Sequence, residues 1–201
     1  MPSPDQVGSV KAALRATRQR RRQERSSADR AAAAAAVVAG LLPGLTGRGA
    51  LAAFVPGVDE PGHGQLVAAL AGRGARLLLP VVPPGEGELA WAEYTGALAR
   101  GRFGLLEPVG PRLPPAELGT VATVVVPALA VDRAGRRLGR GRGYYDRALA
   151  HAAADALLVA VVFDDELLDT LPVEPHDRPV HAVVTPSGGW QPLPHPGVST
   201  T

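Results

Sequence analysis

Short, mostly apolar runs separated by helical patterns are the feature that most constrains the fold of this chain. In Arg76–Val82, Val121–Val126 and Leu157–Phe163 the apolar residues follow one another with little alternation, which is typical of strands buried on both faces of a parallel sheet. A strand, a helix and a second strand in succession favour a right-handed parallel crossover. The expected strands are Ala50–Val55, Arg76–Val82, Leu89–Tyr94, Val121–Val126, Leu157–Phe163 and Ala182–Thr185.

Start and stop signals place helices around these strands. Ser9 is a suitable N-cap for a helix that ends near Glu24, and Ser26 with Asp29 forms a capping box for a second helix through Ala31–Leu41. Shorter helices are expected at Gln65–Ala71 and Tyr144–Ala153. The pattern predicts an α/β protein, with a mostly parallel open sheet and helices on both faces in three layers, α/β/α.

The length of 201 residues suits one well-packed domain, and nothing in the sequence requires a second. That domain is expected to span residues 1–185, with the Gly- and Pro-rich stretch 96–115 on its surface. Residues 186–201 are rich in proline and poor in apolar side chains, so we expect a mobile tail there.

Composition excludes several classes of protein. An apolar fraction of 46% with 20% charged residues is ordinary for a soluble globular protein. The absence of cysteine excludes disulfides, thiol catalysis and cysteine metal sites. No apolar run approaches the roughly 20 residues of a membrane helix, and no secretory signal is recognisable. The chain is therefore expected to be cytoplasmic, without a membrane partner.

A string of glycines and arginines, PALAVDRAGRRLGRGRGYYD, runs from Pro127 to Asp146. Glycines let successive backbone N–H groups point at one anion, and arginines neutralise its charge. The helix that follows adds the positive end of its dipole. The string therefore predicts a phosphate-binding loop, whose glycines are Gly139, Gly141 and Gly143 and whose arginines are Arg137, Arg140 and Arg142.

Other interpretations of this string are weaker. The glycines alone would equally suit a flexible surface loop, but the two tyrosines, the aspartate and the helical pattern that follow favour a binding site. A dinucleotide-binding loop would place its glycines directly after a strand, and a Walker loop would contain Gly-Lys-Ser/Thr, which this chain lacks.

The N-terminal region is strongly basic, with eight basic residues in Lys11–Arg30. Lys11 and Arg15 are four residues apart, so they project from one face of a helix and can grip one polyphosphate together. Lys11 is also the only lysine among 21 basic residues. For the remaining arginines a solvated helix face is the favoured interpretation; these are Arg20, Arg21, Arg22 and Arg25.

The segment Val126–Asp146 resembles the hallmark segment of the 5-formyltetrahydrofolate cyclo-ligases. Three further pieces occur in the family's order across about residues 10–185: Lys11 with Arg15, the acidic pair Asp59 and Glu60, and LPVEPHD at Leu171–Asp177. The chain departs from the usual pattern at Ala128 and Val131, where glycine and an aromatic residue are more common, and in carrying arginine for lysine at Arg142.

The resemblance implies ATP- and Mg²⁺-dependent ring closure of 5-formyltetrahydrofolate to 5,10-methenyltetrahydrofolate, with ADP and phosphate released. It assigns the stabilisation of phosphate charge to Arg137, Arg140 and Arg142. It assigns ATP to Lys11, Arg15, Arg137, Leu138, Gly139, Arg140, Gly141, Arg142, Gly143, Tyr144 and Tyr145. It assigns the folate to Arg15, Glu60, Arg140, Gly141, Arg142, Gly143 and Tyr144, with Phe103 at an aromatic position. It assigns Mg²⁺, the only cofactor implied, to Asp146 and Asp177.

Two other functions remain open from the sequence. One is an ATP-using enzyme of the same fold that acts on another heterocycle or amide, because Glu60 alone does not specify a pterin. The other is a non-catalytic RNA-binding protein that uses the basic N-terminal region, which the acids around the arginine loop disfavour. His176 and His181 lack the further ligands of a zinc site. A monomer or weak dimer is expected.

Overall fold

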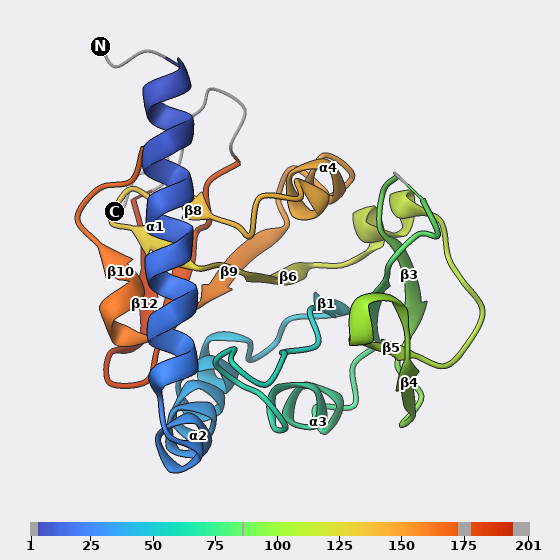
Figure 1. The fold of residues 1–201 in the computed structure, drawn as a ribbon. Coiled ribbons are helices and arrows are strands. Elements are labelled where there is room, and N and C mark those ends of the chain that lie inside the picture. Colours follow the sequence, from blue (N-terminus) through green and yellow to red (C-terminus); the bar gives the residue numbers. More distant parts are fainter. Residues whose placement is uncertain (1–3, 86, 173–177, 195–201) are drawn as a thin grey trace.

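A seven-stranded sheet forms the centre of the structure, a computed structural model that describes residues 4–85, 87–172 and 178–194 (Figure 1). Its strand order is β12-β11-β9-β6-β1-β2-β3; the five inner strands are parallel, whereas β3 and β12 are antiparallel edges. The strands are β1 (Leu51–Ala53), β2 (Leu77–Val81), β3 (Ala90–Glu93), β6 (Thr123–Pro127), β9 (Leu157–Val161), β11 (Ala182–Thr185) and β12 (Gly189–Pro192).

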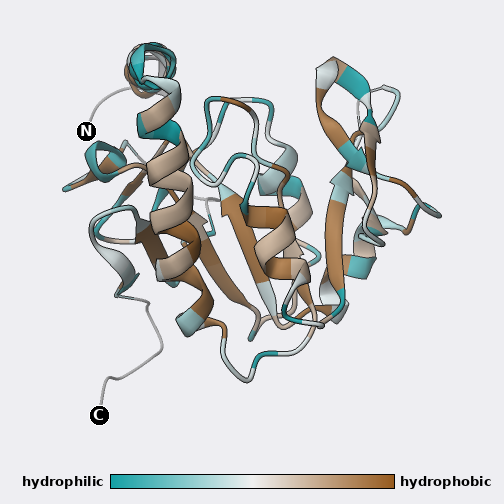
Figure 2. Cartoon of the chain, turned by 90° about the horizontal axis from the view of Figure 1, so that it is seen from below, coloured by the Kyte–Doolittle hydropathy of each residue, from teal (hydrophilic) through white to brown (hydrophobic). Residues whose placement is uncertain are grey.

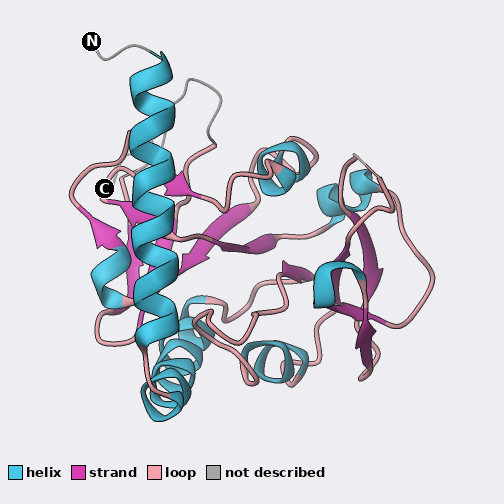
Figure 3. Ribbon diagram, in the orientation of Figure 1, coloured by secondary structure: helices cyan, strands magenta, loops and turns pink. Residues whose placement is uncertain are grey.

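Helices cover both faces of this sheet (Figure 3). On one face, α2 (Ser27–Gly44) and α3 (Leu66–Ala71) pack against strand residues such as Leu51 and Val125. On the other, α4 (Tyr144–Leu149) and the 3₁₀ helix η2 (Pro115–Thr120) pack against residues such as Ala52 and Val124. Since both faces of the inner strands are covered, their side chains are apolar except for the buried Thr123 and Thr185, and the expected three-layer architecture is confirmed.

The first helix, α1 (Pro4–Glu24), lies across the carboxyl ends of the parallel strands instead of on a face of the sheet. Its contacts reach Glu60, Ala128 and Glu166, which follow β1, β6 and β9. Figure 2 shows the contrast: the strands are mostly brown, whereas the ribbon of α1 is largely teal. Polar contacts therefore have a large share in holding this helix.

Several small elements were not expected from the sequence. A three-stranded sheet joins β10 (Leu167–Leu168), β7 (Ala130–Asp132) and β8 (Arg137–Leu138) beside the main sheet. The stretch 96–115 contains a hairpin of β4 (Leu98–Arg100) and β5 (Leu106–Pro108). The remaining 3₁₀ turns are η1 (Arg102–Gly104) and η3 (Asp164–Glu166). The helix expected to reach residue 153 ends at Leu149, and α1 begins before Ser9.

The expected boundary of a mobile tail at Pro186 is wrong for the residues that the structure describes. Gly189–Pro192 form β12, which pairs with β11 in antiparallel register. Trp190 packs against the core between the sheet and α2, where Gly44 leaves room for its ring. The turn and one tryptophan supply enough contacts to order a segment whose composition suggested a tail. Residues 195–201 lie outside the described part of the chain.

Within the described ranges, none of the helices has both the length and the apolar character required to cross a membrane.

Replacing Gly44 by alanine is expected to destabilise the protein, because the added Cβ would overlap the Trp190 ring. Overpacking of this kind costs about 1–3 kcal/mol of unfolding free energy, which urea denaturation can measure. Gly49→Ala is the matched control, since a Cβ there meets no described atom within 4 Å. Equal stability of the two variants would contradict the packing of β12 on α2.

Candidate active site

The glycine and arginine loop runs from β8 into α4, beyond the carboxyl end of β6. Gly141 and Gly143 have φ angles of 92° and 65°, which side-chain-bearing residues rarely adopt, whereas Gly139 has no positive φ. The Arg15 guanidinium donates from Nε to the Gly139 carbonyl (2.9 Å) and lies against Gly141. The structure thus brings the expected phosphate loop and the N-terminal helix together.

One face of α1 carries a stripe of cations, at spacings of four, three and four residues. These residues are Lys11, Arg15, Arg18 and Arg22. Lys11, Arg18 and Arg22 are buried, with 6%, 9% and 1% of their surfaces exposed. This face is therefore turned into the protein, as the spacing along a helix predicts.

The interpretation of the other arginines as a solvated face is correct for two of them and wrong for Arg22. The side chains of Arg20 and Arg21 are 69% and 52% exposed. Arg22 instead forms a buried ion pair with Glu166, at 2.6 Å from Nε to Oε1 and 2.7 Å from Nη2 to Oε2. Arg25 is partly buried against Asp165 and the Phe163 ring.

Glu60 lies in the loop after β1, next to the glycine and arginine loop. Its Oε2 accepts the Gly57 N–H (2.8 Å), and its Oε1 lies 3.0 Å from Arg140 Nη2. Arg140 also pairs with Asp59 (3.2 Å). Glu60, expected to bind the folate, and Arg140, expected to contact both ATP and the folate, therefore lie side by side.

Arg137 and Asp146 join the two ends of the loop in an ion pair of 2.7 Å. The Arg137 side chain is 3% exposed, and its Nε has no hydrogen-bond partner among the described residues. Asp146 remains 48% exposed, so its carboxylate faces both Arg137 and solvent. The buried Arg137 guanidinium thus holds the partly exposed Asp146 carboxylate through this ion pair.

The two tyrosines that follow the loop have different surroundings. Tyr145 packs against both core clusters, and its hydroxyl is buried without a described hydrogen-bond partner. Burial raises the pKa of Tyr145, and the nearby charge of Glu60 adds to this rise. Tyr144 packs at the edge of one core cluster, with the Arg147 guanidinium 5.4 Å from its ring centre.

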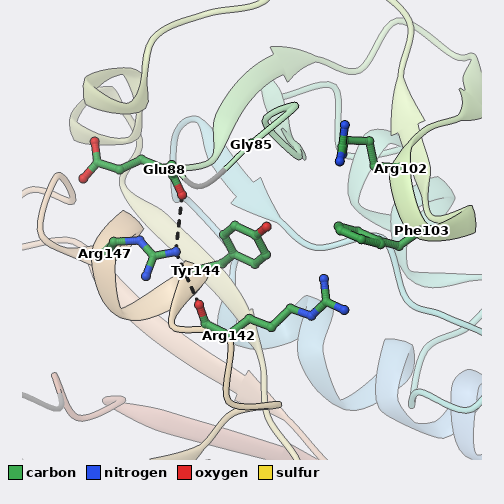
Figure 4. Close-up of a pocket in the computed structure, with 8 residues that line it drawn as sticks. Gly85, Glu88, Arg102, Phe103, Arg142, Tyr144 and Arg147 are labelled. Carbon is green, nitrogen blue, oxygen red and sulfur yellow. Dashed lines mark hydrogen bonds between the residues drawn. The ribbon is translucent and has the colours of Figure 1, made fainter.

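A cleft of about 750 Å³ opens beside Tyr144 (Figure 4). Arg142 Cζ lies 4.2 Å from the centre of the Phe103 ring, and Arg102 Cζ lies 5.5 Å from it. Phe103 has a φ of 56° and is 60% exposed, so the backbone holds an apolar ring at the surface of the cleft. The lining residues are Gly85, Gly87, Glu88, Arg102, Phe103, Arg142, Tyr144 and Arg147.

Several residues that the sequence analysis considered for ligand or metal binding lie away from this site or outside the described residues. Asp177 and His176 lie outside the described residues. Within the described ranges, no group of three His, Cys, Asp or Glu side chains is arranged to hold a metal. His181 Nδ1 accepts the Leu158 N–H (2.9 Å), which ties that ring to the sheet. Ala128 and Val131 are buried, so these departures from the family pattern affect packing rather than a ligand surface.

Sequence reasoning missed several charged residues of this region, among them Glu88, Arg102 and Arg147 in the cleft and Glu166 beneath α1. Arg147 is three residues after Tyr144, a helical spacing that places both on one face. Arg102 lies in the segment Gly-Arg-Phe-Gly, a surface turn signal. Glu166 carried no signal, because its partner is distant in the sequence.

The fold and the site define an α/β enzyme built around a glycine and arginine loop at the carboxyl ends of parallel strands. The chain belongs to the 5-formyltetrahydrofolate cyclo-ligase family, whose model matches residues 7–186. It is 49% identical over 157 residues to the 5-formyltetrahydrofolate cyclo-ligase of Mycolicibacterium smegmatis, covering 75% of this chain and 80% of that one. Its identity to the Escherichia coli K12 protein of the same name is 37% over 125 residues, 59% of this chain and 67% of that one.

Solved structures agree with this assignment. The NMR structure of Aquifex aeolicus 5,10-methenyltetrahydrofolate synthetase matches with a TM-score of 0.76 and 30% identity, covering 96% of each chain. A 5,10-methenyltetrahydrofolate synthetase from Mycoplasma pneumoniae shares the fold at a TM-score of 0.66 and 19% identity, covering 86% of this chain and 96% of that one. The family resemblance expected from the sequence is thereby confirmed.

Gly141→Ala is expected to destabilise the loop, since its φ of 92° is strained for alanine and the Cβ would lie 3.4 Å from the Arg15 guanidinium. The expected loss is about 1–2 kcal/mol of unfolding free energy, measured by thermal or urea denaturation. Gly139→Ala serves as control, because it has no positive φ and a Cβ there meets no described atom within 4 Å. If Gly141→Ala were as stable as this control, the loop conformation would be incorrect.

Proposed function

We propose that this enzyme closes 5-formyltetrahydrofolate to 5,10-methenyltetrahydrofolate at the expense of ATP, with Mg²⁺ bound to the nucleotide. The observation that carries the proposal is the contact between Arg140 of the phosphate loop and Glu60 in the loop after β1 (3.0 Å). It places a group suited to phosphate beside a group suited to the N–H donors of a pterin, as transfer between two substrates requires.

Two neighbouring elements support ATP binding. The phosphate loop has positive-φ glycines and a helix start after Gly143, which favour an anion. Arg15 is joined to this loop through Gly139, and Lys11 lies one turn earlier on the same buried face of α1. A compact lysine ammonium is a point charge suited to phosphate oxygens.

Glu60 and the cleft support folate binding. The Glu60 carboxylate can accept hydrogen bonds from the amino and ring N–H groups of the pterin. The cleft combines Phe103 and Tyr144 with the guanidinium groups of Arg102, Arg142 and Arg147. Aromatic and cationic side chains together suit a substrate that carries a benzoyl ring and a glutamate with carboxylates.

The proposed chemistry is phosphoryl transfer followed by ring closure. The formyl oxygen attacks the γ-phosphorus of ATP, a P–O bond to ADP breaks, and the formyl carbon becomes an activated imidate-like phosphate. The N10 nitrogen then attacks that carbon and loses its proton, and inorganic phosphate leaves with the former formyl oxygen. Arg137, Arg140 and Arg142 stabilise the charge on the transferred phosphate, and the cleft orients the formyl oxygen toward it.

Asp146 fits the proposed magnesium site. Mg²⁺ usually takes one or two carboxylates together with substrate phosphates and water, so a full cage of protein ligands is unnecessary. The half-exposed Asp146 carboxylate, steadied by the buried Arg137, provides one such ligand beside the loop. When bound, the ion would neutralise charge on the phosphates, and Asp177 is proposed as a second ligand.

RNA binding is less well supported. The cations that share one face of α1, from Lys11 to Arg22, are turned into the protein. Arg22 among them is paired with Glu166. A phosphate backbone needs accessible cations along its path.

The direct test mixes the protein with 5-formyltetrahydrofolate and Mg-ATP and follows the near-ultraviolet absorbance of the methenyl product. Product that requires both ATP and magnesium is expected, with ATP-free and EDTA-treated samples as controls. ATP binding without product would favour a related enzyme that acts on another heterocycle or amide.

Lys11→Ala is expected to raise the KM for ATP about tenfold and to change the KM for the folate by less than about twofold, because Lys11 is assigned to phosphate. Steady-state kinetics with each substrate varied in turn measure both constants. Arg20→Ala is the control, since Arg20 lies on the same helix with its side chain 69% exposed. Equal rises in both constants would remove Lys11 from the ATP site.

Glu60→Gln is expected to show the opposite bias, with a KM for the folate raised about tenfold and little change for ATP. The amide keeps an oxygen for the Gly57 N–H but loses the charge that binds the pterin donors. The control is Glu24→Gln, an acid whose side chain is 63% exposed and pairs with Arg20. A wild-type KM for the folate would show that Glu60 does not bind the pterin.

A further inference from the structure

Arg22 is the buried end of the cationic stripe on α1. Its side chain is 1% exposed, whereas the preceding Arg21 on the same helix is 52% exposed. A buried guanidinium is costly unless its N–H groups and its charge are all matched. The positions of its partners therefore indicate what it does.

The partners of Arg22 follow three different strands of the parallel sheet. Glu166, after β9, receives two parallel hydrogen bonds from Nε and Nη2 (2.6 and 2.7 Å). Ala128, after β6, accepts from Nη2 through its carbonyl (2.6 Å). Glu166 is fixed in turn, because its Oε2 accepts the Phe163 N–H (2.9 Å). A bidentate pair with a third contact sets the plane of the guanidinium.

The remaining nitrogen, Nη1, lies 3.9 Å from Oε1 of Glu60, after β1. The same oxygen lies 3.0 Å from Arg140, so two cations share one carboxylate. They differ in their surroundings, since the Arg140 side chain is 46% exposed and that of Arg22 is 1% exposed. Arg140 also belongs to the loop that is proposed to bind phosphate, whereas Arg22 is held by the protein alone.

We propose that Arg22, held by Glu166, is a positioning residue that keeps the Glu60 carboxylate in place for the folate. This inference rests on the proposed function. When Arg140 turns to phosphate, Arg22 stays as the permanent counter-charge of Glu60. Arg22 acts through Glu60 and needs no contact with either substrate.

The test compares wild type with the double variant Arg22→Met/Glu166→Gln, which removes both charges and so avoids an unpaired buried carboxylate. The KM for 5-formyltetrahydrofolate is expected to rise about tenfold, with the KM for ATP changed by less than about twofold. Arg21→Met is the control on the same turn of α1, and circular dichroism shows whether each variant is folded. Should the double variant not fold, Arg22→Lys keeps the charge but loses the bidentate geometry, and the same bias toward the folate is expected.

A second arm separates positioning from a merely structural role. In a Glu60→Gln background, the same double change is expected to raise the KM for the folate by less than about twofold, because the residue through which Arg22 acts is already altered. Independent effects that multiply, or equal rises in both KM values, would overturn the inference while leaving the function intact. Wild-type protein without turnover would instead reject the function on which the inference rests.

Discussion

The buried ion pair between Arg22 and Glu166 is the interaction on which the placement of the first helix depends. The buried face of α1 is cationic, and its Leu14 packs against a small apolar cluster that is separate from the two larger core clusters. Removing one partner of a buried pair typically costs about 3–5 kcal/mol, because the other charge is left without compensation. Acidic residues that follow the parallel strands therefore hold α1 across the carboxyl ends of those strands. The same helix carries Lys11 and Arg15, which are proposed to bind ATP.

The same helix face serves two purposes along its length. Toward its C-terminal end, Arg18 and Arg22 are matched by Asp165 and Glu166 of the protein. Toward its N-terminal end, Arg15 meets a backbone carbonyl of the glycine and arginine loop, which is a neutral partner. One regular spacing thus produces both a structural anchor and an arm of the proposed nucleotide site. The arrangement explains how a helix with so many like charges is stable within the fold.

The sequence predicted the main sheet well because buried parallel strands leave a local pattern, as Val121–Val126 and Leu157–Phe163 illustrate. It did not predict β7, β8 and β10, whose two or three residues are too short for periodicity. The loops around these short strands are instead held by the buried carboxylate of Asp132, which accepts hydrogen bonds from the backbone N–H groups of Ala134, Arg136 and Leu171. The loop and Glu60 were recognisable from the family motif. The burial of Arg22 was not, because charge on a helix ordinarily signals exposure and only a distant carboxylate reverses that rule.

The contact between α1 and η3 joins segments that are far apart in the sequence. Arg22 and Glu166 lie 144 positions apart, and α2 meets Trp190 near the other end of the chain. Contacts between such distant segments form slowly, since a long loop must close before they contribute. During synthesis, Arg22 of α1 must therefore wait until Glu166 has been made before its charge is matched. Only after β9 and η3 have been made can α1 therefore take its place through this ion pair.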